Sequence, residues 1–296
     1  LKRYEPAAAD LQRAYDLQRA AKEDDANTVD ALGQAYARLE KFEQALPLLV
    51  AATTRKPAAG AANAQPDPLM VYYRGLAEYR TGKQAEAESS FNQVVKLDPK
   101  NSVALFYLGR IAYERNDLDA SISGLNRATL NDSGMTSAWA LLLNAYLRRA
   151  AAATVPAKAD ADYVSAVRAG EGLLRVANDE TAAAMLGQAL VGAKQFARAT
   201  TVLERFAVGD KVQGSTLYLL GVSYSRIKNF PKAVGALERA REKTPQDVNI
   251  YRELGYAYEV SKQYAKALAV YEKALELAPD DADFKESAER VRPVAK

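Results

Sequence analysis

VNIYRELGYAYEVSKQYAKALAVYEKALELAPDD, residues 248–281, is the stretch of sequence that decides the fold. In its first half the i, i+3, i+4 and i+7 spacing of one helical stripe is occupied by Tyr251, Leu254, Gly255 and Tyr258. The second half repeats small and apolar residues at helical spacing and reaches Pro279, where a proline terminates a helix. We therefore expect two amphipathic helices within this stretch.

One glycine recurs in the same frame along the chain. A constant interval separates Gly75 from Gly109, and the same interval separates Gly187, Gly221 and Gly255 from one another. Leu143 follows Gly109 by that interval and continues the series, and Gly33 joins it after an insertion of eight residues. An insertion of ten residues separates Leu143 from Gly187. A period of this length predicts a solenoid of stacked helical units, in which glycine lets two helices cross closely.

The repeated unit resembles the tetratricopeptide repeat, a pair of antiparallel helices called A and B. Residues 248–281 match the family's pattern at all eight of its positions, which are Tyr251, Leu254, Gly255, Tyr258, Ala267, Tyr271, Ala274 and Pro279. The resemblance implies an all-α fold, a right-handed α–α superhelix of about seven helix pairs. We expect a single solenoid over residues 1–296, with repeats at 26–59, 68–101, 102–135, 136–179, 180–213, 214–247 and 248–281.

The two ends and the two insertions need separate predictions. Residues 1–25 are predicted to be a partial repeat, a lone B helix, and its missing A partner indicates that the chain is a fragment. Residues 282–296 are predicted to contain a capping helix that starts at Phe284. The insertion at 60–67 is expected to be a loop. The insertion at about 150–160 stands between helices A and B, with helix B restarting at Tyr163. It is either a tolerated loop or lengthened helix, or a protrusion that contacts a partner.

Composition excludes most kinds of chemistry. The chain has no cysteine and no histidine, which removes thiol nucleophiles, histidine triads, disulfides and nearly every zinc site. Acidic clusters at 24–25, 160–162 and 280–283 are interpreted as helix N-caps. The net charge of +3 disfavours a nucleic-acid binder, and no apolar run is long enough to span a membrane. We therefore expect that the protein is not an enzyme and that it binds neither a cofactor nor a metal ion. The alanine-rich composition is typical of bacteria and fits either the cytoplasm or the periplasm.

The family resemblance also implies a binding surface, because helix A of each repeat lines a concave groove. In the family the side chains at repeat positions 2, 5, 9, 12 and 13 point into this groove, and here those at positions 5, 9, 12 and 13 form a column of arginines interleaved with aromatic rings. The predicted groove residues are Arg38, Tyr72, Tyr79, Arg80, Phe106, Arg110, Tyr113, Asn144, Arg148, Tyr218, Arg226, Arg252 and Tyr256. Arginine binds carboxylates in a bidentate manner, and rings provide rigid contact area. The alternative is that these arginines are solvated or pair with neighbouring glutamates, and that the rings pack between repeats.

These features predict a non-catalytic scaffold that binds a protein or peptide with acidic and apolar residues and so assembles a complex. One alternative is a regulatory or substrate-recruiting region of a larger enzyme. RNA binding of the pentatricopeptide kind is disfavoured by the length of the period and the small net charge. Capture of heat-shock-protein tails is disfavoured because repeat position 5 carries no lysine. Self-association through the N-terminal end is also predicted.

Overall fold

The structure is a computed structural model, and it describes residues 4–23, 25–55 and 65–295. Throughout these residues the ordered elements are α-helices, with a single 3₁₀ turn near the end and no strand. The described helices comprise the lone first helix, seven antiparallel pairs and a final helix, which confirms the predicted fold class. The chain divides into two compact units, unit 1 at 1–133 and unit 2 at 134–296.

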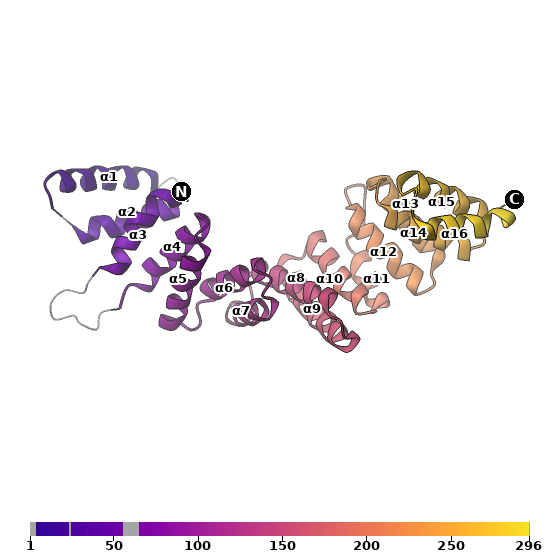
Figure 1. Cartoon of the computed structure of the whole chain (residues 1–296), viewed down its shortest axis with the longest axis horizontal. Coiled ribbons are helices and arrows are strands. Elements are labelled where there is room, and N and C mark those ends of the chain that lie inside the picture. Colours follow the sequence, from indigo (N-terminus) through magenta and orange to yellow (C-terminus); the bar gives the residue numbers. More distant parts are fainter. Residues whose placement is uncertain (1–3, 24, 56–64, 296) are drawn as a thin grey trace. The chain divides into compact units, whose positions relative to one another are not determined.

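Unit 1 contains the first seven helices (Figure 1). They are α1 (Tyr4–Ala20), α2 (Ala26–Arg38), α3 (Phe42–Thr54), α4 (Pro68–Arg80), α5 (Gln84–Leu97), α6 (Ser102–Glu114) and α7 (Leu118–Asn131). Each even-numbered helix is an A helix, and it packs against the odd-numbered B helix that follows it.

Unit 2 contains the other nine described helices and the 3₁₀ turn. They are α8 (Thr136–Ala152), α9 (Pro156–Ala177), α10 (Glu180–Gly192), α11 (Phe196–Glu204), α12 (Gly214–Arg226), α13 (Phe230–Lys243), α14 (Val248–Val260), α15 (Tyr264–Leu277), α16 (Ala282–Val291) and η1 (Arg292–Val294). The predicted capping helix is therefore α16, which packs on α15 and begins two residues before the predicted Phe284.

Short polar side chains start the A helices, as the sequence suggests. The side chains that accept a backbone N–H at these helix starts are Asp25, Asp67, Asn101, Asp179 and Asp247. Asp281 does the same for α16. Asp24 lies outside the described residues. The cluster at 160–162 is not a cap, because it lies inside α9.

The turn between helices A and B also repeats. The residue at repeat position 15 has a positive φ in six of the repeats, namely at Glu40, Gly82, Asn116, Lys194, Lys228 and Lys262. A left-handed residue reverses the chain after helix A and lets helix B return alongside it.

The recurring glycine allows close packing within each pair. A Cβ atom on Gly109 would lie 2.7 Å from Leu125, and one on Gly187 would lie 2.7 Å from Leu203. A Cβ on Gly255 would meet the ring of Tyr271 at a still shorter distance. Glycine mid-helix costs about 1 kcal/mol in propensity. The close crossing and the large side chain that it buries offset that cost.

In the pair α8–α9 the large side chain lies on helix A and the glycine lies on helix B, which is the reverse of the other pairs. Leu143 stands at the glycine position of α8 and is fully buried. Gly170 on α9 supplies the missing volume, since a Cβ there would lie 3.0 Å from the Leu143 side chain. The departure of this repeat from the glycine pattern is therefore compensated on the partner helix.

Arg74 stands at repeat position 7, where repeat 248–281 carries Leu254, and this departure has a comparable explanation. Its Nε donates a 2.7 Å hydrogen bond to Oε1 of Glu78, and the Ser90 hydroxyl donates a 2.6 Å bond to Oε2. Glu78 is only 2% exposed. It occupies repeat position 11, where other repeats carry Tyr36, Tyr146, Tyr224 and Tyr258. Arg74 and Glu78, which both depart from the repeat pattern, thus form one buried polar network with Ser90.

The insertion near 150–160 lengthens both helices of its pair, one of the two alternatives left open by the sequence. Helix α8 runs to Ala152, and α9 begins at Pro156, seven residues before the predicted restart at Tyr163. Arg149 joins the two helices through hydrogen bonds of 2.9 and 2.6 Å to Asp162. Of the insertion at 60–67, residues 60–64 lie outside the described residues.

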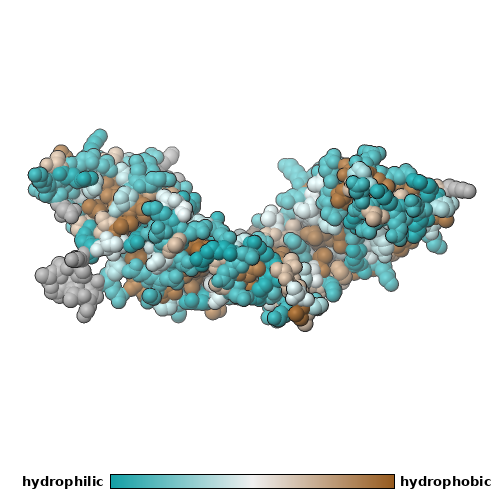
Figure 2. Space-filling model, in the orientation of Figure 1, coloured by the Kyte–Doolittle hydropathy of each residue, from teal (hydrophilic) through white to brown (hydrophobic). Residues whose placement is uncertain are grey.

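The outer surface is dominated by polar residues. Figure 2 shows hydrophilic residues over most of the visible face of both units, with apolar residues scattered between them. Among the described helices, none combines the length and the hydropathy that a membrane span requires.

Candidate functional site

The predicted groove residues all lie on A helices or at their ends. Each unit has its own A-face, formed by α2, α4 and α6 in unit 1 and by α8, α10, α12 and α14 in unit 2. The predicted residues of unit 1 are Arg38, Tyr72, Tyr79, Arg80, Phe106, Arg110 and Tyr113, and those of unit 2 are Asn144, Arg148, Tyr218, Arg226, Arg252 and Tyr256. The two sets are described separately.

Aromatic rings from α4, α5 and α6 form a continuous cluster in unit 1. The ring of Tyr107 stacks on Phe91 with centroids 4.8 Å apart, and it lies 5.3 Å from Tyr79 and 5.4 Å from Phe106. Tyr72 extends the cluster, with its centroid 6.3 Å from that of Phe91. Burial raises the pKa of Tyr72 to about 12, and burial together with a hydrogen bond to a carboxylate raises the pKa of Tyr79 to about 12.

A cleft of about 460 Å³ opens beside this cluster, at the N-terminal ends of α4 and α6. Its walls include Tyr72 together with Leu69 and Val103. Leu69 is 41% exposed, which is a large fraction for a leucine flanked by packed helices. Sequence reasoning missed Leu69 and Val103. The signal was present, because both stand at repeat position 2, which also faces the groove in the family.

Two arginines of this surface have aromatic partners but no carboxylate partner. The Arg38 guanidinium lies 5.1 Å from the ring centroid of Tyr4 and 5.6 Å from that of Tyr73. The Arg80 guanidinium lies 5.4 Å from the ring of Phe42. Within the described part of unit 1, neither arginine forms an ion pair, and both are exposed. Their charges therefore face solvent from an aromatic surface.

Arg110 behaves differently from those two. Its Nε donates a 3.2 Å hydrogen bond to Glu114, and its guanidinium lies 5.3 Å from the Tyr79 ring. The Tyr79 hydroxyl also donates to Glu114. The pairing alternative left open by the sequence thus applies to Arg110. Tyr113, on the same helix, is half-buried.

The arginines of unit 2 connect neighbouring repeats. Arg226 donates two hydrogen bonds, of 2.9 and 2.7 Å, to Glu253. Arg252 donates a 2.6 Å hydrogen bond to Asp281 and lies 4.7 Å from the Phe284 ring. Both arginines thus have carboxylate partners in the next repeat or in the capping helix, so their charges are largely neutralised.

The remaining predicted residues of unit 2 do not converge on one point. Tyr218 is half-buried, and burial followed by the nearby Glu253 raises its pKa. Tyr256 is exposed, with its ring 6.4 Å from that of Phe230. Asn144 and Arg148 lie exposed on α8.

The site carries no feature of a metal centre. Among residues 4–23, 25–55 and 65–295, no group of acidic side chains is arranged to hold a metal ion. The A-face of unit 1 offers a cleft lined by Leu69, Tyr72 and Val103 beside the polar Asp67 and Asn101, a set of rings, and two arginines without carboxylate partners. These groups suit the binding of a ligand.

Comparison with known proteins identifies the repeat. The family model described as tetratricopeptide repeat matches residues 31–102, 72–138 and 218–282. No curated protein matches the chain.

Several solved structures share the fold. The C-terminal part of a TPR repeat-containing protein from Cytophaga hutchinsonii superposes with a TM-score of 0.61 at 13% identity, over 86% of this chain and 97% of that one. YrrB, described as a TPR protein with an unusual peptide-binding site, has a TM-score of 0.54 at 18% identity, over 68% and 97%. MamA from Desulfovibrio magneticus RS-1 has a TM-score of 0.52 at 18% identity, over 61% and 97%. At these identities the similarity concerns the fold alone.

Proposed function

Because the chain belongs to the tetratricopeptide repeat family, whose arrays are generally non-catalytic protein-interaction scaffolds, we propose that its A-face binds a partner protein through an extended peptide segment. The segment carries acidic and apolar residues, and its main binding surface is the A-face of unit 1. One protein of similar fold, YrrB, is described as having a peptide-binding site, which supports this proposed role.

The observation that carries the proposal is the contrast between Arg38 and Arg80 of unit 1 and Arg226 and Arg252 of unit 2. Arg226 and Arg252 already have carboxylate partners. Within the described residues, Arg80 contacts only the Phe42 ring, and Arg38 contacts the rings of Tyr4 and Tyr73 and donates a 2.7 Å hydrogen bond to the Tyr4 hydroxyl, so neither has a carboxylate partner. An acidic side chain of a peptide would supply the carboxylate that Arg80 lacks, and an apolar side chain would fill the cleft beside Tyr72.

Selection from a random peptide library tests this proposal directly. Peptides enriched on the wild-type protein are expected to combine Asp or Glu with large apolar residues. Their affinity, measured by fluorescence anisotropy, should fall about tenfold or more in Arg80→Glu, because an attraction becomes a repulsion. Lys96→Glu is the matched control, since it makes the same charge change on an exposed residue of helix α5. Equal losses in both variants, or enrichment of basic peptides, would contradict the proposal.

Self-association through the N-terminal end is a separate proposal. Leu17 on α1 is 72% exposed, so this helix presents apolar surface. Sedimentation velocity should show an oligomer that Leu17→Glu converts to a monomer. A wild-type protein that stays monomeric at high concentration would exclude self-association.

A further inference from the structure

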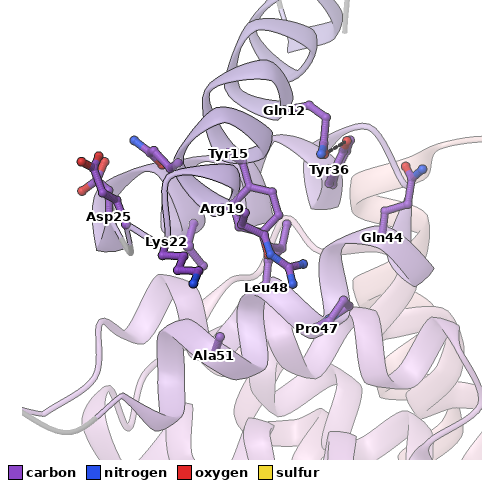
Figure 3. A pocket seen from close by; sticks show the side chains of 13 residues that line it. Gln12, Tyr15, Arg19, Lys22, Asp25, Tyr36, Gln44, Pro47, Leu48 and Ala51 are labelled. Carbon is purple, nitrogen blue, oxygen red and sulfur yellow. Dashed lines mark hydrogen bonds between the residues drawn. The ribbon is translucent and has the colours of Figure 1, made fainter.

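A second cleft lies on the other helices of unit 1 (Figure 3). It has a volume of about 640 Å³ and is enclosed by α1, α2 and α3. Its two walls are the B-type helices α1 and α3, and Tyr36 of α2 contributes to its lining. None of the predicted groove residues lines it. We call it the B-cleft.

Clefts of the same kind recur in unit 2, but they are smaller. One, between α9 and α11, has a volume of about 420 Å³, and another, between α13 and α15, has about 300 Å³. Both are walled by cations at the nineteenth and twenty-sixth positions of the repeat, namely Arg198 and Arg205 in the first and Lys266 and Lys273 in the second. In the B-cleft the same two positions carry Gln44 and Ala51. Two long charged side chains are therefore replaced by a neutral one and a small one.

Uncharged side chains also line the B-cleft between α1 and α3, and the guanidinium of Arg19 lies 5.8 Å from the centroid of the Tyr15 ring. Tyr15 on α1 faces Pro47 and Leu48 on α3 across the opening (Figure 3). Tyr15 stands at the repeat position that is Arg241 in the cleft between α13 and α15. The Tyr36 hydroxyl is held by a 2.6 Å hydrogen bond to Gln12, so its ring is fixed at the base. These side chains suit a large apolar group.

The B-cleft also presents hydrogen-bonding groups that the fold does not use. Gln44 makes no hydrogen bond within the described residues, and its amide can both donate and accept. The donor and the acceptor of the Gln44 amide match the C=O and N–H groups of a peptide backbone.

The charges around the B-cleft balance. Arg19 and Lys22 line one end, and Glu23 and Asp25 line it as well. The Asp25 carboxylate accepts the N–H groups of Asn27 and Thr28 as the cap of α2. Equal numbers of cations and carboxylates give no preference for a charged ligand, in contrast to the A-face of unit 1.

We propose that the B-cleft is a second peptide-binding site, which takes an uncharged extended segment with one large apolar side chain. The apolar side chain packs between Tyr15 and Leu48, and the backbone of the segment hydrogen-bonds to Gln44. None of the predicted groove residues lines this site, so one molecule can hold two segments of different chemistry.

The test uses N-acetyl-phenylalaninamide and N-acetyl-leucinamide as probes, added to the isotopically labelled chain and followed by amide chemical shifts. Saturable shifts are expected at Gln44 and Ala51. Ala51→Lys should reduce the affinity about tenfold or more, since it restores the cation found in the other clefts. Repeat 248–281 already carries a lysine, Lys273, at the position of Ala51, so the substitution is compatible with the fold. Gln44→Lys is a second variant, which places a lysine at the nineteenth repeat position.

Two controls separate this site from the A-face. Arg80→Glu should leave the probe affinity unchanged, and so should added salt, because the B-cleft carries no net charge. Absence of saturable shifts at Gln44 and Ala51 would overturn the proposal, as would full binding by both lysine variants. Loss of acidic peptide binding in Arg80→Glu bears only on the A-face, so the two proposals fail independently.

Discussion

The hydroxyl of Tyr36 on α2 donates a hydrogen bond to the side-chain carbonyl of Gln12 on α1, with the two oxygens 2.6 Å apart. The same hydrogen bond recurs in unit 2, where the Tyr224 hydroxyl donates to Glu204 and the Tyr258 hydroxyl donates to Glu238. Each bond joins helix A of a repeat to helix B of the preceding one. The acceptor is a carboxylate in unit 2 and a neutral amide at the B-cleft, so this hydrogen bond adds no charge to that cleft.

The glycine crossings make the first prediction. Gly255→Ala should lower the free energy of unfolding by about 1–3 kcal/mol, because the new methyl group would overlap the Tyr271 ring. Gly235→Ala is the matched control. Nothing lies within 4 Å of a Cβ at Gly235, which is also mid-helix, so alanine there should stabilise by up to about 1 kcal/mol. Urea unfolding of both variants measures the difference, and equal effects would refute the packing role.

The buried network of unit 1 makes the second prediction. Arg74→Leu alone should destabilise by about 3 kcal/mol, because it leaves the Glu78 carboxylate buried without its cation. The double variant Arg74→Leu with Glu78→Tyr restores the residues found at these positions in repeat 248–281. It should recover most of the lost stability in thermal unfolding. A double variant less stable than the single one would show that the two departures are independent.

The third prediction separates structural arginines from binding arginines. Arg226→Gln should cost about 1 kcal/mol of stability, because Glu253, with its side chain 15% exposed, loses a bidentate partner. Arg80→Gln should leave the unfolding midpoint unchanged, since it breaks no ion pair among the described residues, while it weakens binding of an acidic peptide. Reversed effects in the two assays would contradict this assignment.

The fourth prediction concerns alkaline pH. Tyr72 and Tyr79 have pKa values of about 12 in the folded chain, against 10.0 for an unperturbed tyrosine. Above pH 10 the unfolded chain loses protons that these folded tyrosines keep, so stability should fall as pH rises from about 10 to about 12. Urea midpoints at about pH 9 and about pH 11 measure this fall. The double variant Tyr72→Phe with Tyr79→Phe should show a smaller one, and an unchanged slope would exclude these two groups as its cause.

Much of the fold could be read from local patterns. The spacing of Tyr251, Leu254 and Tyr258 defines a helix by itself, and Pro279 marks where its partner ends. The same frame, repeated along the chain, predicted the helix pairs and the terminal helices that the structure contains. These features depend on residues close in sequence, where helical geometry fixes which side chains share a face.

The pattern said less about the candidate site. It placed Arg38, Arg80 and Arg226 at one repeat position and could not tell them apart. Whether such an arginine meets a carboxylate depends on which side chain the next repeat presents to it. That choice depends on how two stacked helices are rotated, a relationship that helical spacing within one repeat does not contain.

By itself the sequence determined the period, the helix pairs and the surface on which arginines and rings stand, because these follow from the geometry of a single helix. Only the tertiary structure decided that Gly170 makes room for Leu143, that Glu78 is the partner of Arg74, and that cations and carboxylates balance around the B-cleft. The physical reason is that each of these depends on volume and charge shared between helices, so neither partner alone reveals it.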